Sequence, residues 1–269
     1  MRFSSGRHTS NSSSGGLRLP EDVPDFQLDP DKGAFVASFG AKGSGKSELN
    51  KRLFMAYPYD GLLIDHPGDA DAEHRWTEPL PRELLALLPE IDELSRAEDI
   101  DDAGLDAMAA QIEEAWRGGE PRYRKYRYRP NFLADNWLER TDRIIGLAYV
   151  KGKTCVLLDE AGKALPANAT PKFTRTGLEV GRHRKLAMLM PGPRPTGIDP
   201  LGLSQPVVIT IHSPLHQLDV KRLARAFDMS EVELGSELHQ LGEYEYAAKF
   251  KTDPRLHIYP PLPPPRPGQ

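Results

Sequence analysis

The fold of this chain is decided by the stretch Gly40-Ala41-Lys42-Gly43-Ser44-Gly45-Lys46-Ser47, which fits the pattern G-x-x-x-x-G-K-[ST] without a mismatch. An apolar run at 34–39 precedes it, and a helix-like stretch at 47–56 follows, so the pattern has a strand before it and a helix after it. The glycines let successive backbone N–H groups turn toward an anion, and the start of the following helix adds to the attraction. The stretch therefore predicts a phosphate-binding loop.

Two side chains of this loop have expected roles toward ATP and Mg²⁺. The Lys46 ammonium would reach the β- and γ-phosphates, and the Ser47 hydroxyl would ligate the metal ion. The alternative is a glycine-rich turn that matches the pattern by chance. The agreement of both flanking elements favours the phosphate loop.

A second candidate site follows the apolar run at 154–158, which ends in Asp159-Glu160. In a nucleotide hydrolase, the first acid binds Mg²⁺ through water and the second polarises the attacking water. An apolar run before two acids is weak support by itself, since strands commonly end at charged residues. Behind an intact phosphate loop, the spacing favours Asp159 as the metal-binding acid and Glu160 as the general base.

Short apolar runs alternate with helical segments along the chain, which predicts an α/β fold with a mostly parallel sheet and helices on its faces. The expected strands are 34–39, 61–64, 154–158, 186–190 and 207–211, with a closing strand in 243–250. The expected helices are 82–94 with an interruption at Pro89, 103–117, a helix from Thr170-Pro171 toward Gly181, and one from a capping box at Ser230 and Glu233 to Leu241.

The length of 269 residues suits one large domain, expected at 20–252 with a helical insertion at about 75–120. Residues 1–19 are a Ser/Gly-rich arm expected to be disordered, and 253–269 are a proline-rich tail expected to stay extended outside the core. The single cysteine excludes a disulfide framework. No run reaches the ~18 apolar residues of a membrane span, so we do not expect an integral membrane protein.

The formal charge of −4 conceals an uneven distribution. Residues 90–114 contain ten acids and one arginine, so the rest of the chain carries a net positive charge. An acidic surface region would leave a basic face free for nucleic acid elsewhere.

Residues 121–130 alternate five cations with three tyrosines. Arg and Lys side chains there could contact phosphates while the tyrosine rings stack or pack. The alternative is an additional strand, because Tyr126 and Tyr128 alternate with Arg127 and Arg129. We favour the strand, with its outward cations still available to DNA.

A basic stretch, Gly181-Arg182-His183-Arg184-Lys185, lies just before the fourth expected strand. It is interpreted equally well as a solvated helix end, which the helix dipole favours, or as a group with a role in ATP turnover or DNA contact.

The order of these motifs resembles that of the FtsK/HerA superfamily of DNA-pumping ATPases, and most of all the genome-packaging ATPases of tailless and membrane-containing viruses. The resemblance covers about 35–250 and adds Leu62-Leu63-Ile64-Asp65-His66-Pro67-Gly68, Arg194-Pro195 and Gly242-Glu243-Tyr244-Glu245-Tyr246 to the motifs above. It implies a P-loop NTPase of the ASCE type, with a mostly parallel sheet flanked by helices. It further implies a homo-oligomeric ring that acts on double-stranded DNA in the host cytoplasm or in association with the virion. In such a ring Arg182 or Arg184 would act in trans as the arginine finger.

One position departs from the family pattern, which commonly has a polar residue, often Gln, directly before Arg-Pro as a γ-phosphate sensor; this chain has Pro193 there. Arg194 or a neighbour would then take the sensor role. The alternatives are a P-loop ATPase for virion assembly or secretion, and a kinase- or GTPase-type enzyme without DNA pumping. An Asn-Lys-x-Asp guanine motif is absent, because Asn50-Lys51 is followed by Arg52-Leu53. The proline-rich tail is a candidate docking segment for a capsid or membrane protein.

Overall fold

The computed structural model describes residues 26, 28–66, 76–96, 102–120, 122–213 and 215–264. These residues form one nine-stranded sheet in the order β3-β4-β2-β5-β6-β1-β7-β8-β9. The strands are β1 (Phe35–Phe39), β2 (Asp60–Ile64), β3 (Glu78–Pro79), β4 (Lys125–Tyr128), β5 (Thr154–Leu158), β6 (Ala187–Gly192), β7 (Val208–Ile211), β8 (Tyr246–Phe250) and β9 (Leu256–Tyr259). Strands β1 to β7 pair in parallel. Strand β8 pairs with β7, and β9 with β8, both in antiparallel orientation. The expected α/β class is confirmed.

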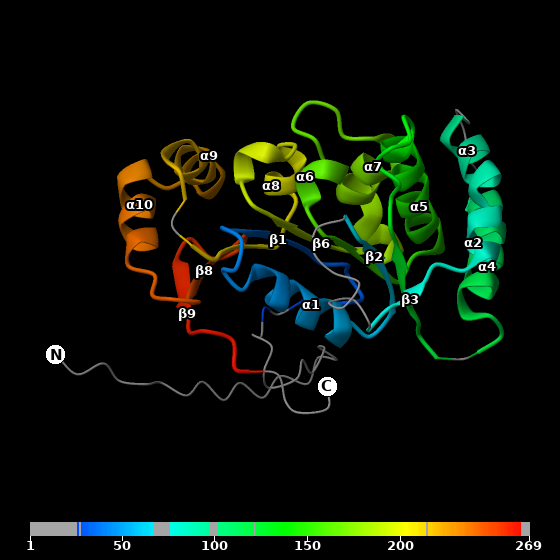
Figure 1. The fold of residues 1–269 in the computed structure, drawn as a ribbon, viewed down its shortest axis with the longest axis horizontal. Coiled ribbons are helices and arrows are strands. Elements are labelled where there is room, and N and C mark those ends of the chain that lie inside the picture. The colour runs from blue at the N-terminus through cyan, green and yellow to red at the C-terminus, as the bar shows by residue number, and fades with distance from the viewer. Residues whose placement is uncertain are drawn as a thin grey trace.

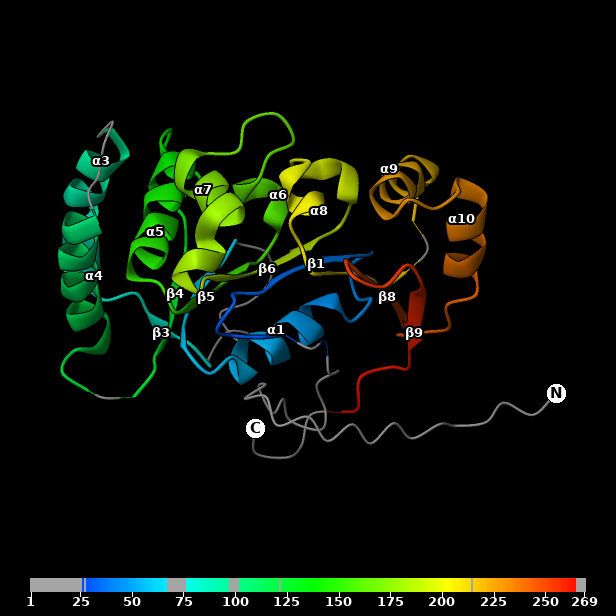
Figure 2. The same cartoon turned by 180° about the vertical axis from the view of Figure 1, so that it is seen from behind.

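Helices cover both faces of the sheet (Figure 1). Helix α1 (Lys46–Ala56) lies on one face, and the opposite face carries α5 (Trp137–Lys151), α6 (Ala161–Ala164), α7 (Lys172–Val180) and α8 (Leu201–Ser204), as the reverse view also shows (Figure 2). The remaining helices are α2 (Arg82–Ala86), α3 (Leu88–Arg96), α4 (Asp102–Arg117), α9 (Gln217–Phe227) and α10 (Glu231–His239). In the parts of the chain that the structure describes, no helix combines the length and apolar character that a membrane crossing requires.

Each face of the sheet has its own apolar core. Under α1, the side chains of Leu49, Leu53 and Phe54 pack against strand residues such as Val36 and Leu63. On the other face, the core is built around α5, α7 and α9. The two cores fix α1 and the strand ends around it, and therefore fix the loop that joins β1 to α1.

The five central strands expected from the sequence are all present, and the basic, tyrosine-rich segment forms the strand β4. Tyr126 is buried, and its hydroxyl donates a hydrogen bond to the Trp116 carbonyl over 2.8 Å. The neighbouring cations are paired within the chain: Arg124 with Glu78 and Glu120, and Arg129 with Asp65. The preference for a strand is confirmed.

Helix α5 is an element to which the sequence analysis assigns no structure. It carries buried apolar residues on several sides, at Ile144, Ile145, Leu147, Ala148 and Val150. A helix buried on several sides lacks a clean polar stripe, so the periodic pattern that marks a surface helix is weak here. Asn136 before the helix and Gly152 after it are the local signals that the sequence does contain.

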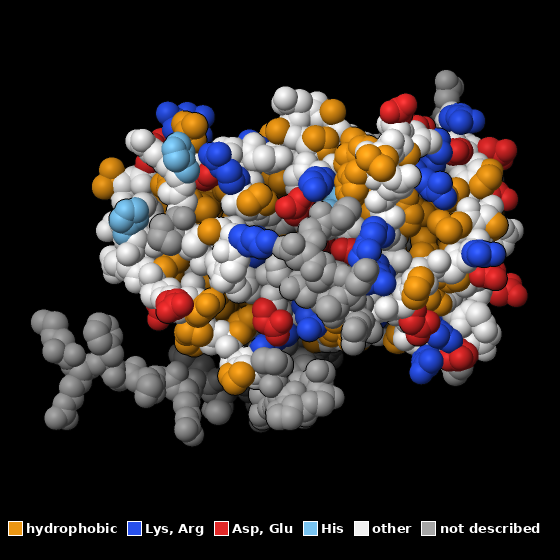
Figure 3. Space-filling view, viewed as in Figure 1, with side chains coloured by type: hydrophobic (Ala, Val, Ile, Leu, Met, Phe, Trp, Pro, Cys, Tyr) orange, Lys and Arg blue, Asp and Glu red, His pale blue; other side chains and the backbone are white. Residues whose placement is uncertain are grey.

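The acidic segment is an outer helical layer of the same domain. Ile91 of α3 and Ile112 of α4 are fully buried in the core that also contains α5. Pro89 is the second residue of α3, where a proline is tolerated, so the expected long helix divides into α2 and α3 at Leu87. Acidic side chains gather along the side formed by α3 and α4, at the right in Figure 3.

The end of the chain differs from the expected boundary at residue 252. Strand β9 pairs in antiparallel with β8, and the Tyr259 ring stacks on Tyr246 with centroids 5.2 Å apart. Beyond the strand, Arg52 of α1 donates a hydrogen bond to the Pro263 carbonyl over 2.6 Å. Pro254 precedes the strand and the remaining prolines begin at Pro260, after it, so no proline interrupts its hydrogen bonding. Residues 265–269 and the arm at 1–19 lie outside the described residues.

Candidate nucleotide-binding and hydrolysis site

The phosphate loop lies at the edge where the parallel strands end, between β1 and α1. Gly43 and Gly45 have φ angles of 81° and 89°, in the left-handed region that glycine adopts without strain. A Cβ atom built on Gly40 would lie 2.8 Å from Ser44 Oγ and 3.0 Å from His212 Cβ. The three glycines of the motif are thus required for two different reasons, backbone conformation and close packing.

Lys46 begins helix α1 and folds back over the loop. Its Nζ donates a hydrogen bond to the Ala41 carbonyl over 3.1 Å. Burial lowers the pKa of Lys46, while the charges of Asp159 and Glu160 act in the opposite direction. The lysine and the two acids therefore lie close enough to interact, although they come from β1–α1 and from the end of β5. Ser47, the next residue, is exposed in the first turn of α1.

Glu160 follows β5 in an unusual backbone conformation. Its φ and ψ angles are 89° and 72°, a region that a residue with a side chain rarely adopts. Its carboxylate is about half exposed and forms an ion pair with Lys163 at 3.0 Å. Strain of this kind gathers at functional positions, where the surrounding structure holds it in place.

The strand β6 lies between β1 and β5, so one strand separates the phosphate loop from the acid pair. Gly192 is the register partner of Phe39, which places Pro193 and Arg194 level with the start of the phosphate loop. Arg194 is half exposed, and its Nε bonds Asp219 over 2.9 Å. Asp219 is buried and also accepts hydrogen bonds from the N–H and hydroxyl of Thr196. A fixed arginine therefore follows the proline that departs from the family pattern.

Two residues that the sequence analysis omits complete the loop. Ser213 Oγ accepts a hydrogen bond from the Ala41 N–H over 2.9 Å, and His212 packs beneath Gly40. The pKa of His212 is lowered to about 3, by burial first and by the Lys46 charge second, while a hydrogen bond with the Ser44 backbone acts in the opposite direction. Both residues directly follow β7, a strand that the sequence predicts. Their place at the carboxyl end of a parallel strand is the signal that could have identified them as site residues.

Arg182 and Arg184 lie at the opposite edge of the sheet, where the strands begin. Arg182 donates a hydrogen bond to the Gln205 carbonyl and lies over the Phe35 ring, 5.1 Å from its centroid. Arg184 donates to the Val150 carbonyl. A strand of five or six residues is roughly 16–20 Å long. The structure therefore brings Lys46, Asp159 and Glu160 together in one chain and leaves both arginines away from them.

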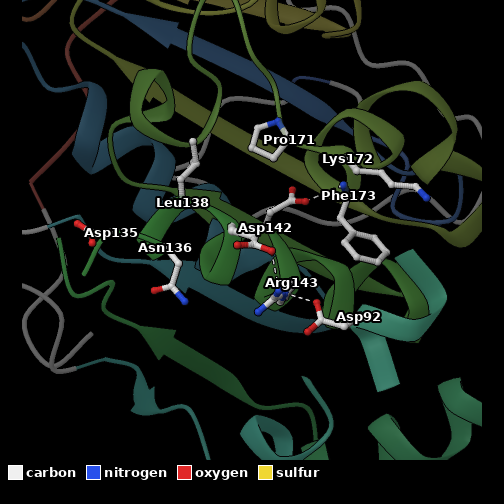
Figure 4. Close-up of a pocket in the computed structure, with 10 residues that line it drawn as sticks. Asp92, Asp135, Asn136, Leu138, Asp142, Arg143, Pro171, Lys172 and Phe173 are labelled. Atoms are coloured by element: carbon white, nitrogen blue, oxygen red, sulfur yellow. Dashed lines mark hydrogen bonds and ion pairs between the residues drawn. The ribbon is translucent and has the colours of Figure 1, made fainter. Parts of the chain in front are cut away.

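A cavity of about 590 Å³ lies elsewhere, between the starts of α5 and α7 (Figure 4). Asp142 in its wall accepts hydrogen bonds from the N–H groups of Phe173 and Thr174, and so caps α7. Arg143 in the same wall pairs with Asp92 of α3. The lining of this cavity includes neither phosphate-loop residues nor Asp159 or Glu160. The side chains of Asp142 and Arg143 connect neighbouring helices instead.

Comparison with solved structures agrees with this geometry. The DNA-packaging ATPase B204 of Sulfolobus turreted icosahedral virus superposes with a TM-score of 0.61 at 14% identity, covering 87% of this chain and 100% of that one. The chain has the P-loop NTPase fold. The genome packaging NTPase B204 of Sulfolobus turreted icosahedral virus 2, in complex with AMP, gives a TM-score of 0.60 at 15% identity over the same shares. No protein-family model matches the sequence, and no curated protein matches it either.

Proposed function

We propose that this chain is a Mg²⁺-dependent ATPase that assembles into a homo-oligomer and moves double-stranded DNA, with the packaging of a viral genome as its setting. The observation that carries the proposal is the strand order β5-β6-β1. It places a complete phosphate loop and an acid pair at one edge, one strand apart. The host cytoplasm or the virion is the corresponding location.

The residues around the loop suit a nucleoside triphosphate. The left-handed glycines direct backbone N–H groups toward an anion at the start of α1, and Lys46 has its ammonium group folded over the same loop. Lys46 would exchange its bond to the Ala41 carbonyl for the β- and γ-phosphates. Ser213 would keep the loop open by holding the Ala41 N–H.

The donor set also suits Mg²⁺, which takes oxygen ligands and needs only one or two from the protein. Ser47 offers an exposed hydroxyl, and Asp159 a carboxylate within the electrostatic reach of Lys46. When bound, the ion would neutralise phosphate charge during hydrolysis. Glu160 would accept a proton from the attacking water as the general base.

Support for a DNA cargo comes from two features. The solved neighbours with this fold include packaging NTPases. In addition, the acidic helices α3 and α4 lie at one end of the sheet, apart from the phosphate loop (Figure 1). Lysine and arginine side chains occur across the middle of the face shown in Figure 3. A ring would place the ATP of one subunit against its neighbour.

The deciding experiment measures phosphate release by the full-length protein with Mg²⁺-ATP, with and without duplex DNA. We expect turnover that rises several-fold with duplex DNA and is lost when EDTA removes the metal. Lys46→Ala should nearly abolish turnover while leaving the fold intact, which circular dichroism checks. Turnover that duplex DNA leaves unchanged would favour an assembly or secretion ATPase. Transfer of phosphate to a small acceptor in place of water would favour a kinase.

A further inference from the structure

His66 is a buried histidine next to the proposed general base. It follows β2, and Glu160 follows the adjacent β5. Ile64 and Leu158 are register partners in these parallel strands, and the Asp159 N–H donates a hydrogen bond to the Ile64 carbonyl over 3.0 Å. His66 and Glu160 each lie two residues beyond these register partners, at the same edge of adjacent strands, although the chain has already turned out of the extended conformation at Glu160.

The ring of His66 is unpaired despite its burial. It is only 2% exposed, and neither Nδ1 nor Nε2 has a hydrogen-bond partner among the described residues. Its ring contacts are apolar: Phe132 at 5.5 Å and Trp137 at 6.3 Å between centroids. Buried polar groups are nearly always hydrogen-bonded, so two unpaired nitrogens at one ring indicate a partner that arrives in another state of the protein.

The charges that act on His66 identify that partner. The pKa of His66 is lowered to about 4, by burial first and by the Lys163 charge second, while Glu160 and Asp65 act in the opposite direction. Asp65 is already engaged by Arg129, whose Nη2 lies 2.7 Å from its carboxylate. Among the residues that the structure describes, the Glu160 carboxylate is held by Lys163 alone, a half-exposed side chain three residues along the chain. At neutral pH the His66 ring is uncharged, with one N–H to donate.

We propose that His66 is a positioning residue for Glu160, donating a ring N–H hydrogen bond to the Glu160 carboxylate when that carboxylate leaves Lys163 to hold the attacking water. The inference rests on the proposed ATP hydrolysis. In the ion pair, the carboxylate is directed toward the Lys163 ammonium. A ring N–H from His66 would orient one carboxylate oxygen and leave the other for the attacking water, as a general base requires.

Phe132 touches both alternative partners of Glu160. Its ring packs against His66 on one side, and the Lys163 ammonium lies 5.1 Å from its centroid. Trp137, at the start of α5, packs against the same ring at 4.7 Å. These aromatic side chains fix the imidazole while leaving its N–H free, which is what a positioning residue needs.

The test compares three full-length variants with the parent: His66→Leu, which fills the space without a hydrogen bond; His66→Gln, which keeps an N–H donor; and His239→Leu, a control at an exposed histidine of α10. Phosphate release gives kcat and KM, and equilibrium binding gives the Kd for ATP. We expect His66→Leu to lower kcat about ten- to hundredfold, with the Kd within about threefold of the parent. His66→Gln should keep at least about a third of kcat, and His239→Leu should stay close to the parent.

A double-mutant cycle separates positioning from general damage. In a Glu160→Gln background, under single-turnover conditions, His66→Leu should lower the residual rate no further, because the group it orients is gone. Parental kcat in His66→Leu, or an equal loss in both backgrounds, would overturn the inference while leaving the ATPase proposal intact. A His66→Gln variant as slow as His66→Leu, with thermal unfolding showing both folded, would also overturn it. A parent protein without any ATP turnover would contradict the proposed function itself.

Discussion

The two edges of the parallel sheet carry motif residues in very different surroundings. At the edge where the strands end, several polar groups are poised without a partner: both nitrogens of His66 and the Ser44 hydroxyl are buried and unpaired among the described residues. At the edge where the strands begin, charged groups are bonded within the chain, although Arg182 Nε is also without a partner among the described residues. Arg182 and Arg184 donate to carbonyls, and the buried Lys151 ammonium lies 2.7 Å from Asp60.

This difference shows how to distinguish groups that await a ligand from groups that join elements. A buried polar atom without a partner is unfavourable, and the unpaired atoms of His66 and Ser44 lie beside Glu160 and in the phosphate loop, where a bound ligand or a moved side chain would satisfy them. An arginine that donates a hydrogen bond to a carbonyl of the same chain already has a partner. The predictions that follow test this contrast between the two edges.

The largest effect is expected at Glu160. Replacing it with Gln keeps the shape but removes the base, so turnover should fall by roughly 10²- to 10⁴-fold while ATP binding is retained. Phosphate release and equilibrium nucleotide binding measure the two quantities. Glu179→Gln, at an exposed acid of α7, is the matched control and should keep parental turnover. A Glu160→Gln variant that hydrolyses ATP at the parental rate would remove the general-base assignment.

The next effect concerns the aromatic stack beside the phosphate loop. His212 stacks on Tyr246 at 4.9 Å, and Tyr246 stacks on Tyr259 of β9. Removing residues 253–269 deletes β9 and should lower the free energy of unfolding by about 3 kcal/mol, since it exposes a buried aromatic face. Urea denaturation measures this change.

The matched truncation for that stack removes only residues 265–269, which lie beyond Pro264, and should leave both stability and ATP turnover at parental values. Deleting the arm at 1–19 should likewise leave ATP hydrolysis unchanged, because the motifs lie outside it. Equal stability of the two C-terminal truncations would show that β9 adds nothing to the fold.

A smaller effect should appear as the pH falls. The pKa values of His66 and His212 in the folded protein are lowered to about 4 and about 3, against an ordinary value near 6.5. Below pH 6.5 the unfolded chain binds protons at these residues while the folded chain does not, so the free energy of unfolding decreases. The loss is about 2 kcal/mol for each histidine at pH 5, and it continues down to the folded pKa.

Urea denaturation at pH 7 and pH 5 checks this pH dependence. His66→Gln should lose about 2 kcal/mol less than the parent between the two values, because the carboxylates are common to both proteins and cancel. His239→Gln changes an exposed histidine of α10 and should behave as the parent does. An identical loss in His66→Gln and the parent would mean that His66 is not held neutral by burial.

The sequence predicts the site better than it predicts the layers around it. The phosphate loop and the acids at 159–160 depend on local patterns, and the five central strands have apolar runs that a buried parallel sheet requires. Helix α5 lacks a clear amphipathic pattern because it is buried on several sides. The roles of His66 and His212 depend on the register between strands that are far apart in the chain, and single-sequence patterns contain no register.

The smallest expected effects are at the edge where the strands begin. Since Arg182 and Arg184 each bond a carbonyl, either Ala variant should lower the free energy of unfolding by about 1.5 kcal/mol, measured by urea denaturation. Arg175→Ala, at a half-exposed arginine of α7, is the control and should change it by less than about 0.5 kcal/mol. A stability loss no larger than that of the control would show that the carbonyl contacts contribute little.

Mixing variant subunits tests whether either arginine, besides its contact within the chain, also acts on the ATP of a neighbouring subunit. An arginine finger would make the Ala variant bind ATP normally but turn over poorly as an assembly, because the missing charge belongs to the neighbour's site. Adding Lys46→Ala subunits would then restore activity at intermediate ratios, since an intact phosphate loop would face an intact arginine. A purely structural arginine gives no restoration at any ratio, and a DNA-contacting one loses stimulation by DNA while basal turnover persists. Flat activity across all ratios, with mixed assembly verified, would exclude the trans finger and leave both arginines as ties between strand ends.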